Sequence, residues 1–219
     1  MSPLRTSVLA LGLLAMACAP KAHAARRDRL PPPAPVSRAG TRDPGVGPAS
    51  GLDRPVQARR PPRDQVLRRA IETASALVGQ REIVVAGVHW GDGCAALVRA
   101  AFADAGAAFP DGARDAGALH AIARDRAATH RDPAAGDLVF LADRPGGPAE
   151  HVGLVATVSA EGTALVLHRT EHGVVRVHVN GAQPWKLRAD SGRALNDVLL
   201  VGAGRIPAGR LLVAYAKVL

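Results

Sequence analysis

Aromatic residues and cysteine are scarce in this chain of 219 residues, and a long apolar run is missing. Phe, Trp and Tyr make up 3% of the sequence, and there are two cysteines. A nucleic-acid-binding domain carries positive charge on a folded face, together with aromatic side chains that stack on bases. So few aromatics argue against a nucleic acid as partner, in spite of the net charge of +9. No apolar run reaches the ~20 residues that a transmembrane helix needs.

Acidic residues are scarce in the first part of the chain, where the positive charge is concentrated. Residues 1–63 hold 11 of the 28 Lys and Arg, 3 of the 19 Asp and Glu, and 11 of the 17 prolines. Residues 25–63 show no apolar periodicity, so they bury too little surface to offset the entropy of ordering. We predict a disordered linker rich in Pro and Arg over 25–63 and one folded domain over 64–219.

The first 24 residues have the pattern of a signal peptide. A short positive start precedes an apolar run over residues 7–17, which is too short to span a bilayer. Two processing sites follow: Ala22-His23-Ala24 is an A-x-A cleavage site, and residues 14–18 are similar to a bacterial lipobox that would acylate Cys18. Both predict export to the periplasm or cell envelope, and the second adds a lipid anchor. Both leave Cys94 as the one thiol available for chemistry.

Hydrophobic spacing predicts helices in the first half of the domain and strands in the second. The helices are expected at residues 66–78, 94–105 and 116–128. The strands are expected at residues 137–142, 151–158, 163–168, 174–179, 198–201 and 211–216. Helices followed by an antiparallel sheet make an α+β domain.

Cys94 begins the second predicted helix, directly after the turn Gly91-Asp92-Gly93. The free amides and the positive dipole at a helix N-terminus stabilise a thiolate, and the same amides can hold an oxyanion. A buried core cysteine is the alternative for Cys94 taken alone. His151 opens a predicted strand, where its imidazole can take the thiol proton. His168 ends the next strand, where it can orient the first imidazole.

The order of these motifs resembles that of the papain-like cell-wall hydrolases. It comprises a cysteine at a helix start, Gly-Asp-Leu-Val-Phe at residues 136–140, His-Val-Gly at residues 151–153 and a polar residue ending the next strand. The chain is similar in this to CHAP domains (cysteine, histidine-dependent amidohydrolase/peptidase) and to the related NlpC-type peptidases, over about residues 66–180. NlpC-type members usually show Asp-Cys-Ser-Gly, whereas Gly93 precedes the cysteine here, which is nearer to the CHAP pattern.

The resemblance implies both a fold and a reaction. The fold is papain-like, with N-terminal helices and the cysteine-bearing helix packed on a small antiparallel sheet that carries the two histidines. Cys94 is then the nucleophile, His151 the base and His168 the orienting residue. The reaction is hydrolysis of an amide bond in a peptidoglycan peptide through a thioester, with no cofactor or metal. His89 is a candidate for a second oxyanion donor.

Two other functions use the same residues. His168, Glu171 and His172 fit H-x-x-E-H, the inverted zinc-peptidase motif, which must lie on a helix. Its flanks are predicted strands, so the required context is missing. A catalytically silent cell-wall-binding module of the same fold is the second alternative, against which the presence of all three triad residue types argues. No oligomeric state is predicted.

Overall fold

The computed structural model describes residues 61–110, 112–202 and 204–217. The predicted signal peptide, Cys18 with both processing sites, and nearly all of the predicted linker lie outside these residues. The predicted α+β class is confirmed, because helices come first and an antiparallel sheet follows. The three longer helices are α1 (Arg63–Ala76), α2 (Cys94–Asp104) and α3 (Ala116–Asp125).

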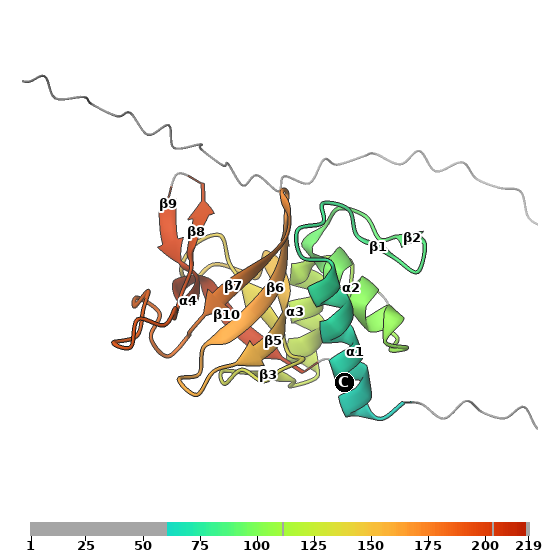
Figure 1. Ribbon diagram of the computed structural model, residues 1–219, viewed down its shortest axis with the longest axis horizontal. Helices are drawn as coiled ribbons and strands as arrows, with labels where there is room; N and C mark the ends of the chain where they lie inside the picture. Colours follow the sequence, from blue (N-terminus) through green and yellow to red (C-terminus); the bar gives the residue numbers. More distant parts are fainter. Residues whose placement is uncertain (1–60, 111, 203, 218–219) are drawn as a thin grey trace, which may run out of the picture. The chain divides into compact units, whose positions relative to one another are not determined.

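A six-stranded antiparallel sheet forms the centre of the domain, in the spatial order β3-β10-β4-β5-β6-β7 (Figure 1). Its strands are β3 (Thr129–His130), β4 (Leu138–Leu141), β5 (His151–Val158), β6 (Ala164–Thr170), β7 (Gly173–Val179) and β10 (Leu212–Ala216). In the register of the central strands, Leu141 lies opposite His151, and Gly153 lies opposite His168. The start of β5 and the end of β6 therefore meet at one edge of the sheet, which brings the two predicted site histidines together.

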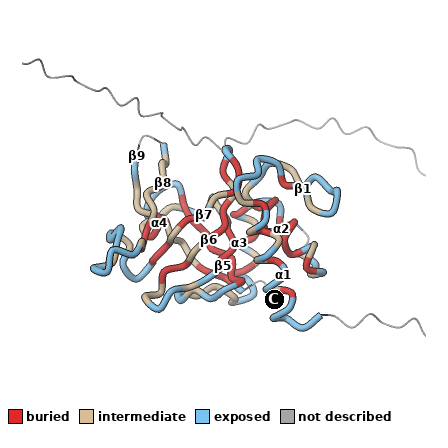
Figure 2. The backbone as a smooth tube through the Cα atoms, in the orientation of Figure 1, coloured by how far each residue is buried: buried red, intermediate tan, exposed pale blue. Residues whose placement is uncertain are grey.

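Side chains that alternate along the strands build two separate cores, one on each face of the sheet. Leu138 and Phe140 of β4 join the core beneath the three helices. Val139 and Leu141 join the second core, to which Ala208 and Leu211 of the short helix α4 (Ala208–Leu211) also belong. Figure 2 shows both cores as the buried centre of the domain.

Helix α2 is the most deeply buried of the helices, and its alanines explain why. Four of its buried residues are alanine, so the backbone can approach both α1 and β5 closely. Phe102, which has no exposed surface, packs against Phe109 with ring centroids 5.5 Å apart and planes tilted by 47°. This tight packing fixes the position of α2, and with it the position of Cys94 at its first turn.

The structure also contains elements that the hydrophobic pattern did not predict. Two antiparallel hairpins lie outside the main sheet: β1 (Val84–Val85) with β2 (Val88–His89), and β8 (Val198–Val201) with β9 (Gly204–Pro207). The strand expected at residues 198–201 therefore pairs with β9, not with the main sheet. The third helix is shorter than expected, because Ala127 has a left-handed backbone (φ 52°) just after it.

Gly153 of the His-Val-Gly motif lies where no side chain fits. A Cβ atom at this position would meet Cγ1 of Val166 at 2.6 Å and the carbonyl oxygen of Leu167 at 2.8 Å. The glycine thus lets β5 and β6 lie together just beside the two histidines. It is a packing requirement of the motif.

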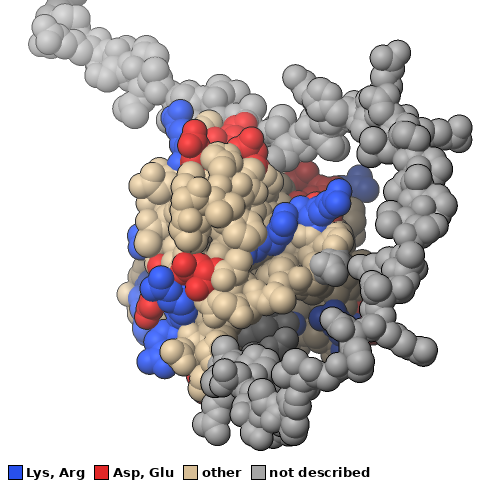
Figure 3. All heavy atoms as spheres, turned by 90° about the vertical axis from the view of Figure 1, so that its right-hand side faces the viewer, with Lys and Arg blue, Asp and Glu red and all other residues tan. Residues whose placement is uncertain are grey.

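The charged side chains of the face shown in Figure 3 are of both signs, interspersed among uncharged ones. Nε of Arg69 on α1 pairs with Oδ2 of Asp104 of α2 at 2.9 Å. Within the described residues, no helix is long and apolar enough to cross a membrane.

Candidate active site

Cys94 is the first residue of α2, and the helix offers its N-terminal amides to whatever lies beside the thiol. The N-cap residue is Gly93, whose backbone is extended (φ −72°, ψ 156°), and no side chain caps the helix. The amides of Cys94 and Ala95 and the positive end of the dipole therefore remain available to stabilise negative charge, whereas the amide of Ala96 donates to the carbonyl oxygen of Gly93 at 2.9 Å. The thiol is partly exposed and donates to the carbonyl oxygen of Glu150, at a distance of 3.8 Å. Cys94 thus lies at the boundary of the core and is open to solvent on one side.

His151 lies between this thiol and an aspartate. Its Nε2 is 2.5 Å from Oδ1 of Asp143, and because a carboxylate accepts, Nε2 carries the hydrogen. Nδ1 is then the nitrogen that remains for the thiol of Cys94. The hydrogen bond with Cys94 raises the pKa of His151, and the bond and charge of Asp143 raise it further. Burial acts in the opposite direction, and the resulting pKa is about 9. The imidazole is therefore held in its protonated form at neutral pH.

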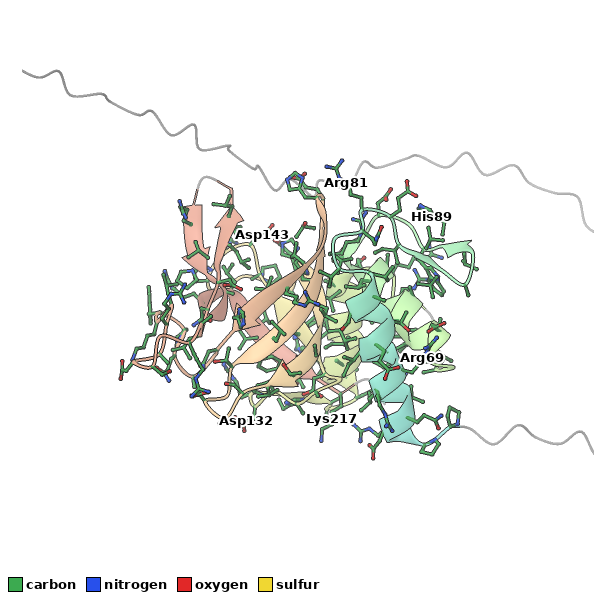
Figure 4. All side chains as sticks on the ribbon, in the orientation of Figure 1. Arg69, Arg81, His89, Asp132, Asp143 and Lys217 are labelled. Carbon is green, nitrogen blue, oxygen red and sulfur yellow. The ribbon has the colours of Figure 1, made fainter. Side chains whose placement is uncertain are left out.

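Asp143 is the site residue that the sequence analysis missed. It follows β4, and the pairing of Leu141 with His151 brings it back over the start of β5. Figure 4 shows it at the upper edge of the sheet. A hydrogen bond from Glu150 lowers the pKa of Asp143, and the same bond raises the pKa of Glu150. The lowered pKa keeps Asp143 ionised, so its negative charge faces His151.

His168 lies beside His151, as its place on the neighbouring strand predicted. Their ring centroids are 5.6 Å apart and their planes are nearly perpendicular, at 89°. His168 is only 3% exposed, and its Nδ1 donates to the carbonyl oxygen of Val152 at 3.2 Å. Burial, with a smaller effect from the charge on His151, lowers the pKa of His168 to about 4, so this ring is neutral. The hydrogen bond at Nε2 of His151 goes to Asp143, and His168 contributes an edge-to-face contact.

Two further candidates are not placed in this cluster. Nδ1 of His89 accepts from the amide of Gly91 at 3.2 Å, so this ring faces its own loop, and Figure 4 shows it well apart from Asp143. The zinc motif does not have the geometry it needs, because His168 lies on β6 whereas Glu171 and His172 lie in the turn before β7. Within the described residues, no group of three His, Cys, Asp or Glu side chains gathers as a metal site.

A comparison with protein families finds a match to part of this domain. Residues 86–193 match the NlpC/P60 family. The match is slightly shorter than half of the chain, and it contains Cys94, Asp143, His151 and His168. Of the two families that the sequence resembles, the NlpC-type peptidases are therefore the one that this match supports. Among curated proteins, none matches the chain.

Two solved structures are similar to the chain, each at 17% identity and over 69% of its length. The crystal structure of Ly7917 has a TM-score of 0.37, and the match spans 61% of that chain, less than two thirds of its length. The P60 domain of the antigen MAP1204 from M. avium subspecies paratuberculosis has a TM-score of 0.31, with 96% of that chain covered. At these TM-scores the functional argument rests on the site itself.

Proposed function

We propose that this protein is a cysteine hydrolase of the NlpC/P60 type that cleaves an amide bond in peptidoglycan peptides. One observation carries the proposal. Cys94 lies at the uncapped N-terminus of α2 beside His151, and the second nitrogen of that imidazole is held at 2.5 Å by Asp143. A nucleophile, a base and a group that holds the base in place are the three parts that thiol-based acyl transfer requires.

In the proposed reaction, the Cys94 thiolate attacks the carbonyl carbon of the scissile amide. The oxyanion that forms is stabilised by the first-turn amides of α2, including that of Cys94 itself. Protonated His151 gives its proton to the leaving nitrogen, and the C–N bond breaks to leave a thioester. Neutral His151 then takes a proton from water, the hydroxide attacks the thioester, and the thiolate and the carboxylate product are released.

Asp143 and His168 have different parts in this scheme. Asp143 accepts from Nε2 of His151 and stabilises the imidazolium, which leaves Nδ1 as the nitrogen that can serve the thiol. His168 remains the proposed orienting residue, acting through its perpendicular contact with the His151 ring instead of through a hydrogen bond to it. Its low pKa keeps a second positive charge away from the imidazolium.

The place of action is part of the proposal. The apolar run at residues 7–17 and the processing motifs support export, and Cys18 is the proposed acylation site. Gly93 before the cysteine, as in the CHAP pattern, supports a CHAP-like amidase or endopeptidase as the type of enzyme. Labelled palmitate fed to cells that express the chain, with Cys18→Ala as control, tests the lipid anchor.

The test of the activity uses the chain from residue 25 onward, free of metal, with bacterial sacculi as substrate. Fragments released by the native protein are identified by mass, beside Cys94→Ser and Cys94→Ala controls. We expect fragments from the native protein alone, with masses that identify the amide bond. Equal release by the Cys94 variants would contradict a thiol hydrolase, and release by none of them would favour the silent binding module.

A further inference from the structure

Arg169 directly follows His168 on β6, and its guanidinium is buried under the loop that leads to Cys94. Only 9% of its side chain is exposed. A charged side chain at the end of a strand is ordinarily solvated, so its burial calls for a partner that balances the loss of hydration.

Two of the carbonyls that accept from Arg169 come from opposite ends of one loop, and a third, that of Thr170 on its own strand, lies 3.4 Å from Nη1. Nη2 donates to the carbonyl oxygen of Arg81 at 2.8 Å, and Nη1 donates to the carbonyl oxygen of Asp92. Nη2 also lies 3.3 Å from Oδ1 of Asp92, but that carboxylate is 88% exposed, so the ion pair is the weaker part of the contact. The planar fork of one guanidinium thus holds both ends of the loop at once.

The loop between these carbonyls, residues 82–91, contains the β1–β2 hairpin. Within it, the amide of Trp90 donates to the carbonyl oxygen of Ile83 at 2.9 Å. Just before it, Gly79 donates to the carbonyl oxygen of Val174 on β7, and Val174 donates to that of Gln80. The start of the loop is therefore tied to the sheet by backbone bonds, whereas its end is tied to the sheet by Arg169.

The C-terminal end of the loop, which Arg169 holds at Asp92, is two residues before the nucleophile. Asp92 precedes Gly93, the N-cap of α2, and Cys94 follows. A hydrogen bond to the Asp92 carbonyl sets the plane of the peptide that joins Asp92 to Gly93, and so the direction in which the chain enters the helix. Through Arg169 and its bond to Asp92, strand β6 contacts the Cys94 side of the site. Through His168, the residue before Arg169, the same strand contacts His151.

We propose that Arg169 is a positioning residue that closes the loop of residues 82–91 and so sets the placement of the Cys94 thiol and amide. The inference rests on the proposed function for Cys94 as the nucleophile. A lysine cannot replace Arg169, because one ammonium group cannot hold two carbonyls in a fixed plane.

The experiment compares Arg169→Lys and Arg169→Ala with Arg176→Lys, which changes an exposed arginine on the neighbouring strand. Hydrogen exchange in the full chain measures the amides of residues 82–94 and, separately, those of β5 and β6. In both Arg169 variants we expect exchange in residues 82–94 to become about tenfold faster or more, since charge-assisted hydrogen bonds are lost, while β5 and β6 stay protected. Arg176→Lys should exchange like the native chain.

Turnover and chemical rescue supply a readout that a purely structural role would not move. For Arg169→Ala, kcat should fall by roughly 10²-fold, because small displacements of a nucleophile cost that much, while KM changes little. Added guanidinium ions should restore part of kcat and of the loop protection in Arg169→Ala but not in Arg169→Lys. Native exchange in residues 82–94 of Arg169→Lys would overturn the proposal, as would faster exchange throughout β5 and β6. Hydrogen exchange does not depend on turnover, so a chain without hydrolase activity still tests the loop contact.

Discussion

Replacing Asp143 by Asn should move the pH dependence of the reaction. The change keeps the shape of the side chain but removes the charge 2.5 Å from Nε2 of His151. That charge is one of the causes that raise the His151 pKa to about 9, after the hydrogen bond with Cys94. A nearby opposite charge shifts a pKa by roughly 1–3 units, and the Asp143 side chain is 55% exposed, so we take the lower end, about 1 unit.

The sign of the shift follows from which form of His151 is needed. Protonated His151 gives its proton to the leaving nitrogen, so kcat/KM falls as pH rises through its pKa. Native protein should therefore lose activity near pH 9, and Asp143→Asn about 1 unit lower. The assay is kcat/KM on a soluble muropeptide across neutral and alkaline pH, with Asp132→Asn as control, since Figure 4 shows Asp132 far from Asp143. An unchanged alkaline limb in Asp143→Asn would refute the role given to Asp143.

Two more predictions concern the stability of the strands that carry the site. The pKa of buried His168 is about 4 in the folded protein, below the value of about 6.5 in the unfolded chain. As pH drops between these two values, the unfolded chain binds a proton at this histidine and the folded protein does not. The free energy of unfolding should therefore fall over this range, by about 3 kcal/mol in total. In urea titrations at each pH, the free energy of unfolding of His168→Gln should lack this decrease. An equal decrease with falling pH in both proteins would contradict a neutral buried ring. Gly153→Ala should lose about 1–3 kcal/mol, because its Cβ would lie 2.6 Å from Val166. Gly117→Ala in α3, with no contact closer than 3.4 Å, is the matched control, and similar thermal midpoints for the two would refute the packing argument.

The parts of the site that follow strand and helix periodicity could be predicted from the sequence. Cys94 is at the start of a helix because the apolar spacing of α2 begins there, after two glycines. His151 and His168 come together because neighbouring antiparallel strands place the start of one beside the end of the next. These relations are local, or span two consecutive strands, so hydrophobic patterns are sufficient to find them.

Asp143 and Arg169 depend on contacts that no periodicity encodes. Asp143 lies in the irregular segment after β4, and only the register of β4 against β5 brings it to His151. Arg169 bonds a carbonyl 77 positions earlier in the chain, and a charged residue at a strand end is by default expected in water. An acidic residue in the segment joining the Gly-Asp-Leu-Val-Phe strand to the histidine is the one sequence signal that could have indicated Asp143.

The pairing of Cys94 with His151 is the central claim, and the pH dependence of thiol alkylation tests it most directly. The rate of iodoacetamide labelling at Cys94 is measured by peptide mass across acidic to alkaline pH, in native protein and in His151→Ala. A free thiol labels slowly below its pKa of about 8.5. We predict rapid labelling of native Cys94 well below that pH, lost in His151→Ala. Labelling that rises only above pH 8, alike in both proteins, would contradict the pair.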